Sequence, residues 1–561
     1  MFEMGGHKHV IGLGMTVLVA WVGYGLAPHP VAAIEVANAQ MLTGTNVRSS
    51  CEQVAYSLDE LVECITDHMP ALGSEDYVLP SGSIQSDWRA VVEDLAALDD
   101  ISDCDTISLP TSLSGIYEVF PFYDAYDGRE YCVAMEVEDA NDDQVVDRGW
   151  GTLIVNPTPE RHLSIDIPHP IEDDDTNLQG IAIFKGVGAH TFVMAGANRY
   201  ANSAASSCQE DEVESDVAHS IDNLFFPTVV EIDQHYSNAS IEHTAIQFHG
   251  MTSSGCPNVG IYITHGSEDA PQSSDSIVAL KDALLAVKPS WGGLGVQTVA
   301  NPGQSGAACS KNGTDNVEGR YLNTGNEALV CGSDVDVYNG RFIHVEQDPG
   351  EYRDPMIWIE ALEDAFAPVS APPVTTSVSF QNGVAPSSGY AGTTDTWLDA
   401  DDADDNMGAD ATCEADGDEK SVILRWDVSA IAGSSTIDEV TITLDVINAT
   451  DSRGYYVYPL SRAWSEDHAT WDDYDDSLPW QVPGASGAMD RAATPVAKWT
   501  PRSTGKHTFS INPALVQAWV DDDDSNHGVV IVNEGNSNGV DFYCSEATTA
   551  GSRPKLTVVY H

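Results

Sequence analysis

The stretch LSIDIPHPIEDDD, residues 163–175, joins an apolar strand to a histidine and a run of acidic residues. Similar apolar stretches are predicted to be strands at residues 151–155, 191–195, 244–248, 260–264 and 341–345. Helices are predicted at residues 217–226, 276–287 and 355–366. Strands that alternate with helices indicate an α/β domain with a mainly parallel sheet, in which sites form at the carboxyl ends of strands.

Two other regions flank this α/β domain of residues 151–366. Residues 40–150 alternate helical stretches with strand-like runs, and no role is predicted for them. A proline-rich linker at residues 367–376 leads to residues 377–561, where short strands separated by turns predict a β-sandwich. The chain is therefore predicted to be multidomain, with an α/β domain followed by an all-β sandwich.

The composition is strongly acidic. The chain of 561 residues has 24 basic and 87 acidic side chains, which gives a formal net charge of −63. Such a surface stays hydrated where salt screens its repulsion, so we expect a halophilic or marine source. Nucleic acid is excluded as a partner because phosphate contacts need clustered Lys or Arg. Hydrophobic residues make up 42% of the chain and are spread throughout, which excludes a disordered acidic tail.

The N-terminus is typical of an export signal. Lys8 precedes an apolar run over residues 10–26, and small-residue cleavage sites follow at residues 31–33 and 37–39. We therefore predict a signal peptide over residues 1–39 and a secreted protein without a stable membrane anchor, an uncleaved anchor being the alternative. No other stretch is long enough to cross a bilayer.

The cysteines favour disulfides. There are ten of them, an even number, and none forms a C-x-x-C pair, which in an exported protein indicates disulfides over thiolate metal sites. Spacing alone does not determine the connectivity. The expected pairs are Cys51–Cys64, Cys104–Cys132, Cys208–Cys256, Cys309–Cys331 and Cys413–Cys544.

Metal-binding residue types follow two of the predicted strands. His169 and Glu172 come directly after the strand at residues 163–167, and His249 follows the strand at 244–248. Two histidines and a carboxylate can bind Zn²⁺ and leave one position open for water. Asp173 is an alternative to Glu172 as the acidic ligand, and a solvated acidic loop is the alternative to any metal site.

Other polar residues near strand ends are candidates for catalysis or substrate binding. Glu346 could accept a proton from water, and Arg199, next to Asn198, could pair with a substrate carboxylate. His219 and His265 could also contact substrate, although structural histidines are common at strand ends. No G-x-S-x-G elbow, P-loop or dinucleotide-binding glycine motif occurs in a suitable context.

The region of about residues 160–365 resembles the zinc carboxypeptidase clan in the order of its motifs. These motifs are His-x-x-Glu, Asn-Arg, a strand-terminal His and a late Glu. The region is most similar to the N-formylglutamate amidohydrolase and succinylglutamate desuccinylase branches. The resemblance implies one zinc per chain held by His169, Glu172 and His249. It further implies substrate contacts from Asn198 and Arg199, catalysis by Glu346, and a peptide or N-acyl amino acid as substrate.

The C-terminal half resembles the secreted β-sandwich modules called DNRLRE domains, some of which bind carbohydrate. The matching segments include Leu-Arg-Trp-Asp at residues 424–427, Trp-Ser-Glu at 464–466 and Arg-Pro-Lys-Leu at 553–556. Trp464, Trp471 and Trp480 could form a platform for sugar rings, or they could belong to the sandwich core. Acidic loops at residues 399–405 and 521–524 could hold Ca²⁺ or could simply be solvated.

Together these features predict a secreted zinc-dependent amide hydrolase that acts next to a carboxylate and is tethered to polysaccharide or a cell surface. The alternative from another class is a non-catalytic protein that binds matrix or polysaccharide. A third hypothesis is an enzyme that cleaves polysaccharide with paired carboxylates and no metal.

Overall fold

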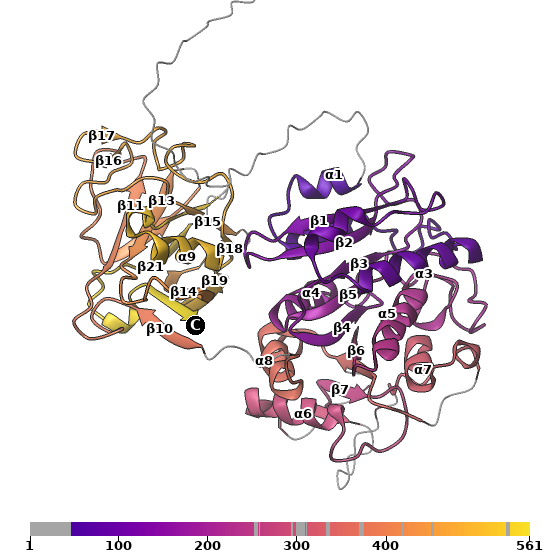
Figure 1. Cartoon of the computed structure of the whole chain (residues 1–561). Coiled ribbons are helices and arrows are strands. Elements are labelled where there is room, and N and C mark those ends of the chain that lie inside the picture. The colour runs from indigo at the N-terminus through magenta and orange to yellow at the C-terminus, as the bar shows by residue number, and fades with distance from the viewer. Residues whose placement is uncertain are drawn as a thin grey trace, which may run out of the picture. The chain divides into compact units, whose positions relative to one another are not determined.

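In the computed structural model of the protein, the strands before residue 367 form one sheet, and helices flank this sheet (Figure 1). The structure describes residues 47–251, 256, 258–292, 295–298, 309, 311–332, 337–369, 375–417, 419–449, 454–533 and 539–561. The predicted signal peptide lies outside these residues, as does half of the predicted linker, residues 370–374.

The sheet has nine strands in the order β1-β2-β3-β5-β4-β6-β9-β7-β8. Their bounds are β1 (Tyr117–Tyr123), β2 (Glu130–Glu136), β3 (Thr152–Val155), β4 (Arg161–Ile167), β5 (Ala189–Met194), β6 (Thr244–Gly250), β7 (Ile261–Thr264), β8 (Val296–Thr298) and β9 (Phe342–Gln347). The pairs from β5 through β4 and β6 to β9 are parallel, as is β7 with β8. The pairs β1–β2, β2–β3, β3–β5 and β7–β9 are antiparallel. The sheet is therefore mixed, with a parallel centre. The prediction was a mainly parallel sheet.

The described part of the N-terminal segment, residues 47–150, does not stand apart from this sheet. Strands β1 and β2 extend it through β3, so the boundary predicted between residues 150 and 151 falls inside one sheet. β2 is one of the strand-like runs predicted within residues 40–150. A single sequence carries no signal for which sheet such a strand joins.

Helices cover both faces of the sheet (Figure 1). They are α1 (Val47–Glu52), α2 (Leu58–Asp67), α3 (Gly82–Ala96), α4 (Thr176–Gly186), α5 (Phe225–Ala239), α6 (Ser276–Val287), α7 (Val317–Thr324) and α8 (Pro355–Ala365). Apolar residues of α2, α4, α6 and α8 form one core with one face of the sheet. Those of α3, α5 and α7 form a second core with the opposite face.

One predicted helix is wrong in its bounds. Residues 217–226 form only a short 3-10 helix, Val217–His219, and α5 begins at Phe225. The Asn223 side chain explains this, because its Oδ1 accepts a hydrogen bond from Phe226 N at 2.7 Å and thereby ends the turn before the helix. The other two predicted helices agree with α6 and α8.

The central strands carry polar residues on one face. Along β6, Ile246 and Phe248 join the core under α4 and α8, whereas Gln247 and His249 point to the opposite side. In the parallel register, His249 pairs with Glu346 of β9. Because paired residues of neighbouring strands project from the same face, the two side chains lie beside each other at the carboxyl ends of their strands.

The sandwich has two antiparallel sheets. One has the order β10-β22-β14-β21-β12, with β19 paired to β14, and the other has the order β11-β13-β20-β15-β18. The bounds are β10 (Thr376–Phe380), β11 (Thr393–Asp399), β12 (Thr412–Ala415), β13 (Lys420–Trp426), β14 (Ile437–Asn448), β15 (Tyr455–Pro459), β18 (Ala497–Trp499), β19 (Gly505–Ser510), β20 (Val529–Asn533), β21 (Val540–Tyr543) and β22 (Lys555–Tyr560). A small hairpin, β16 (Asp473–Asp475) with β17 (Leu478–Pro479), and one helix, α9 (Pro513–Asp521), complete it. The predicted β-sandwich therefore contains one helix.

Ten cysteines form five disulfides. Cys51–Cys64, Cys104–Cys132 and Cys413–Cys544 agree with the expected pairs. The other two expected pairs are wrong, because Cys208 bonds to Cys331 and Cys256 to Cys309. Proximity along the chain misled the prediction, since Cys208 and Cys331 are 123 residues apart and only the fold brings them together. Among the described helices, none is long and apolar enough to cross a membrane.

Candidate functional site

The turn after β4 brings His169 and Asp173 together. Asp173 N donates a hydrogen bond to His169 O at 3.1 Å, which closes one helical turn. In such a turn the side chains of residues four apart share a side. Asp173, not Glu172, therefore lies beside His169, and the two side chains are joined by a contact of 3.1 Å between His169 Nδ1 and Asp173 Oδ2.

Three buried side chains converge at this point. His249 Nδ1 lies 3.2 Å from His169 Nδ1 and 3.7 Å from Asp173 Oδ2. The side chains of all three residues are less than a tenth exposed. They form one of the groups of ligand atoms within 4.8 Å of one another among the described residues. We call His169, Asp173 and His249 the histidine–aspartate cluster.

The outer nitrogens of both histidines are held by acceptors. His169 Nε2 contacts Asp216 Oδ1 at 3.0 Å, and His249 Nε2 contacts Gln247 Oε1 at 2.8 Å. A carboxylate or amide oxygen accepts a hydrogen bond, so each Nε2 carries the proton in the neutral ring. Each Nδ1 is then left with a lone pair that points into the cluster. Hydrogen bonds of this kind orient histidines that bind metal ions.

The electrostatics of the cluster keep its acid ionised. Burial alone would raise the pKa of Asp173, but the neighbouring His169 and His249 outweigh it and hold that pKa well below its ordinary value. Burial lowers the pKa of His249 to about 4, so this ring is neutral at pH 7. Burial and Arg199 lower the pKa of His169, but Asp216 and Asp173 outweigh them and raise it.

Glu346 is the carboxylate next to this cluster. It is 6% exposed, and burial raises its pKa from 4.5 to about 7. Its Oε2 has no hydrogen-bond partner in the described part of the chain. Its Oε1 lies 3.8 Å from Lys311 Nζ and 4.0 Å from His344 Nε2. A buried carboxylate with a pKa near neutrality and a free oxygen is suited to accept a proton.

The predicted substrate-binding pair has other partners. Arg199 donates from Nε at 2.9 Å and from Nη2 to Asp216 Oδ2, and its Nη1 lies 3.3 Å from His169 Nδ1. Asn198 Nδ2 donates to Glu172 Oε2 at 3.2 Å. Glu172 is exposed and outside the cluster. Arg199 therefore borders the histidine–aspartate cluster, whereas Glu172 is turned away from it.

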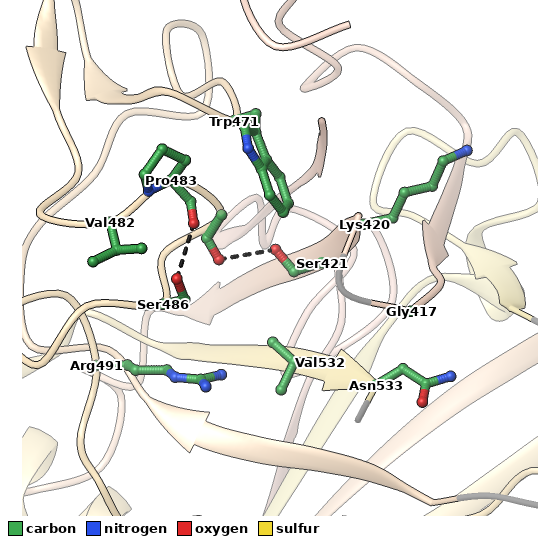
Figure 2. A pocket seen from close by; sticks show the side chains of 11 residues that line it. Gly417, Lys420, Ser421, Trp471, Val482, Pro483, Ser486, Arg491, Val532 and Asn533 are labelled. Carbon is green, nitrogen blue, oxygen red and sulfur yellow. Dashed lines mark hydrogen bonds between the residues drawn. The ribbon is translucent and has the colours of Figure 1, made fainter. Parts of the chain in front are cut away.

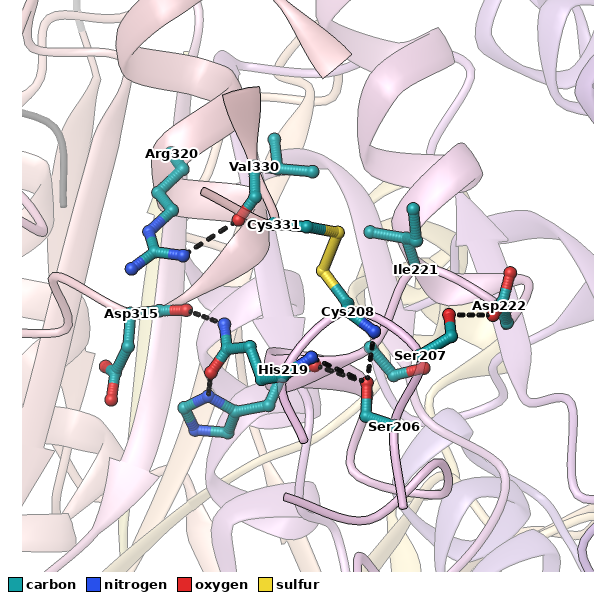
Figure 3. Close-up of a disulfide and its surroundings, with 12 residues drawn as sticks. Ser206, Ser207, Cys208, His219, Ile221, Asp222, Asp315, Arg320, Val330 and Cys331 are labelled. Carbon is teal, nitrogen blue, oxygen red and sulfur yellow. Dashed lines mark hydrogen bonds between the residues drawn. A yellow bond between two sulfur atoms is a disulfide. The ribbon is translucent and has the colours of Figure 1, made fainter. Parts of the chain in front are cut away.

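His219 lies outside the cluster. Its Nδ1 contacts Gln209 Oε1 at 3.0 Å, close to the disulfide between Cys208 and Cys331 (Figure 3). Ser206 Oγ donates to the carbonyl of His219 at 2.9 Å. The ring is thus part of the loop network around this disulfide.

His265 is also absent from the cluster. Its Nδ1 contacts the carbonyl of Phe342 at 3.0 Å, and its ring stacks on Tyr338. The reason is the direction of β7, which runs antiparallel to β9. The carboxyl end of β7 therefore meets the amino end of β9, at the sheet edge opposite Glu346. The predicted substrate contact from His265 assumed a parallel β7.

Sequence reasoning missed three residues of the site. Gln247 could have been found, because it lies two residues before His249 and so shares its face of the strand. Asp216 could not have been found, because no local pattern connects it to His169, 47 residues earlier. Lys311 follows no motif, and only the fold brings it to Glu346.

The tryptophans predicted to form a platform differ in burial. Trp464 and Trp480 are 5% and 3% exposed and belong to a core outside the five-stranded sheet, so they are not available to a ligand. Trp471 is half-buried. The acidic loops at 399–405 and 521–524 form no converging group in the part searched, whereas carboxylates of Asp395, Glu466 and Glu546 do.

Comparison with known proteins bears on the sandwich. No curated protein matches the chain. A crystal structure of a gene product from Agrobacterium tumefaciens has 14% identity and a TM-score of 0.21, and the match covers 36% of this chain and 84% of that one. A similarity of that size supports no statement about function. Residues 386–560 match the model of carbohydrate-binding module family 96. This match supports a carbohydrate-binding domain at the C-terminus.

Proposed function

We propose that the protein is a secreted zinc-dependent hydrolase that cleaves an amide bond next to a carboxylate, and that its C-terminal domain tethers it to polysaccharide. The five disulfides suit an exported protein. The carbohydrate-binding domain suits a tether. The hydrolase part of the proposal rests on the histidine–aspartate cluster.

The spacing of the three ligand atoms carries the proposal. His169 Nδ1 lies 3.1 Å from Asp173 Oδ2 and 3.2 Å from His249 Nδ1, and His249 Nδ1 lies 3.7 Å from Asp173 Oδ2. Ligand atoms about 2.0–2.1 Å from a tetrahedral zinc lie roughly 3.3 Å from one another. Two facing imidazole lone pairs also repel each other unless a cation or a proton lies between them. Two nitrogens, one oxygen and an open fourth position are the donor set of a catalytic zinc site.

The remaining residues have roles that follow from their contacts. Zinc bound by this cluster would lower the pKa of water towards neutrality. Glu346 would accept the proton from that water and return it to the leaving amine. Asp216 and Gln247 would keep His169 and His249 in the tautomer that has a free Nδ1.

Two cations would favour a substrate with a carboxylate: Arg199, which borders the cluster, and Lys311, which lies beside Glu346. Lys311 is the more available, because its side chain is 43% exposed and its nearest acid is Glu346 at 3.8 Å. Arg199 is committed to Asp216 through two nitrogens, and its Nη1 contacts His169 Nδ1 at 3.3 Å. The substrate class that fits is an N-acyl amino acid or a peptide with a carboxylate beside the cleaved bond.

The test is the zinc content of the purified full-length chain, measured by mass spectrometry after chelation and reloading. We expect about one zinc per chain in the wild type, and loss of zinc in His169→Ala and His249→Ala. Glu172→Gln is the matched control, because Glu172 is adjacent to the cluster but outside it. Zinc binding would justify assays with N-acyl amino acids and glutamyl peptides. A wild type that binds no zinc would refute the hydrolase and leave a non-catalytic polysaccharide-binding protein.

A further inference from the structure

Asn316 holds its own side-chain amide in one orientation. It is the N-cap of α7, and its Oδ1 accepts a hydrogen bond from Gly319 N at 2.8 Å. A backbone N–H only donates, so the atom of the amide that faces it must be the oxygen. The NH₂ group of Asn316 therefore lies on the other side of the amide. The residue is 2% exposed, so this NH₂ group needs an acceptor inside the protein.

That acceptor is Gln247 of β6. Asn316 Nδ2 donates to Gln247 Oε1 at 2.5 Å. The same oxygen lies 2.8 Å from His249 Nε2. An NH₂ group cannot accept a hydrogen bond, so Gln247 presents its oxygen to Asn316 and, with the same atom, to His249. The proton of the neutral His249 ring is then on Nε2, and Nδ1 keeps its lone pair.

Gln247 alone would not select this arrangement. A glutamine amide that is turned over offers its NH₂ group in place of its oxygen, and His249 would then accept with Nε2 and hold its proton on Nδ1. Gln247 Nε2 has no hydrogen-bond partner in the described residues. Burial raises the pKa of the neighbouring Glu318 well above its ordinary value, although Gln247 lowers it. A protonated carboxyl can donate or accept, so Glu318 fits either orientation of the amide.

We propose that Asn316 is the positioning residue that sets the tautomer of His249. Donor and acceptor roles pass from the Gly319 backbone through Asn316 and Gln247 to the imidazole, and each hydrogen bond leaves the next atom one role. An Nδ1 with a free lone pair can bind zinc, whereas an Nδ1 that carries the proton cannot. This consequence rests on the proposed zinc site. The tautomer itself is a property of the metal-free protein and is measured without zinc.

The decisive variant is Asn316→Asp. It keeps the shape of the side chain and the helix cap, since one carboxylate oxygen still accepts from Gly319 N. The other oxygen replaces the donor to Gln247, so the Gln247 amide turns to offer its NH₂ group. His249 Nε2 then meets a donor, and the proton moves to Nδ1. If thermal unfolding shows that Asn316→Asp does not fold, Asn316→Ser takes its place, because the shorter hydroxyl caps the helix and donates nothing to Gln247.

Two controls separate the tautomer from a general loss of packing. Gln247→Glu offers an oxygen to Asn316 and His249 whichever way it turns, so it keeps the proton on Nε2. Ser421→Ala removes another buried hydrogen bond, the one that Ser421 Oγ donates to the Gly484 carbonyl at 3.2 Å in the C-terminal sandwich (Figure 2). Neither control changes what the Asn316 side chain donates.

Two measurements are made on the full-length chain. NMR of chelated protein that carries ¹⁵N-labelled histidine shows which ring nitrogen of His249 holds the proton at pH 7, and His249→Gln assigns its signals. Zinc affinity is measured by competition with a chelator. We expect the proton on Nε2 in the wild type and both controls. In Asn316→Asp we expect it on Nδ1, with zinc bound about 10–100-fold more weakly, and in Asn316→Ser shared between both nitrogens.

The outcomes distinguish the tautomer from the proposed function. A proton on Nδ1 in the wild type, or on Nε2 alone in the Asn316 variant, would overturn the inference whatever the zinc content. The expected tautomers in a wild type that binds no zinc would support the inference and overturn the proposed hydrolase. The expected tautomers with an unchanged zinc affinity would overturn the connection between Asn316 and the metal.

Discussion

Replacing Glu346 by glutamine should make the metal-free protein more stable at pH 8 and abolish its turnover. The carboxyl group is 6% exposed, and burial raises its pKa from 4.5 to about 7. Ionising it in the folded state is therefore unfavourable. Glutamine has nearly the same shape and carries no charge, so it removes that cost.

The magnitude and sign follow from linkage. The folded state holds the proton more tightly than the unfolded state, so this contribution to stability is complete below pH 4.5 and is lost as the pH rises towards 7. A pKa of about 7 instead of 4.5 corresponds to about 3 kcal/mol, at roughly 1.4 kcal/mol per pKa unit. In a domain of this size that free energy corresponds to roughly 6–12 °C in melting temperature.

The assay is calorimetric unfolding of chelated wild type and Glu346→Gln between pH 4.5 and 8. The gap between their melting temperatures should be small at the acid end and grow until about pH 7.5. Zinc-loaded Glu346→Gln should retain its metal and lose a factor of 10² or more in kcat/KM. A gap that does not change with pH would refute the reasoning about burial. Unchanged turnover would remove Glu346 from catalysis.

Other predictions concern the acidic metal ligand, the orientation of His249, the disulfide between Cys208 and Cys331, and the dependence of stability on salt. Asp173→Asn should lose zinc, by mass spectrometry, whereas Glu172→Gln should keep it; the reverse result would contradict the assignment of the acidic ligand. Gln247→Leu removes the acceptor of His249 Nε2 and should weaken zinc binding 10–100-fold in a chelator competition, and an unchanged affinity would argue against this role. Replacing Cys208 and Cys331 by serine should lower the free energy of unfolding by about 2–5 kcal/mol in denaturant titrations. Lowering NaCl from 1 M to 0.01 M should lower the melting temperature, because the screening length grows from about 3 to about 30 Å around a net charge of −63; no change would contradict the salt-adapted surface.

Local pattern predicted the elements better than their arrangement. Alternation and helical periodicity located the central strands and helices α6 and α8 within a few residues. The direction of a strand cannot be predicted from the local sequence pattern, because it depends on how the connecting segments lead the chain back to the sheet. The antiparallel β7 moved His265 to the opposite sheet edge, and the return of β1 and β2 to the same sheet erased the boundary at residue 150.

The candidate site divides in the same way. His169, His249 and Glu346 were predicted because each lies at or just after the end of a strand, and parallel strands bring such ends together. Glu172 and Asp173 could not be separated by pattern, because both are acidic and adjacent. The hydrogen bond from Asp173 N to His169 O decides between them, since it makes residue 173 the one that faces His169.

The acidic composition explains why residue type alone does not identify the carboxylates of the candidate site. With 87 Asp and Glu residues, an acid near any histidine is expected by chance. Most acids are solvated by water, so their charge costs little free energy. Asp173, Asp216 and Glu346 are among the buried acids, at 8%, 0% and 6% exposed, and a buried carboxylate needs a cation, a hydrogen-bond donor or a proton. Asp216 has Arg199 and His169, and Asp173 has both histidines. Among the described residues, Glu346 has Lys311 at 3.8 Å and His344 at 4.0 Å, burial raises its pKa to about 7, and this suits it to the role of proton acceptor that we propose.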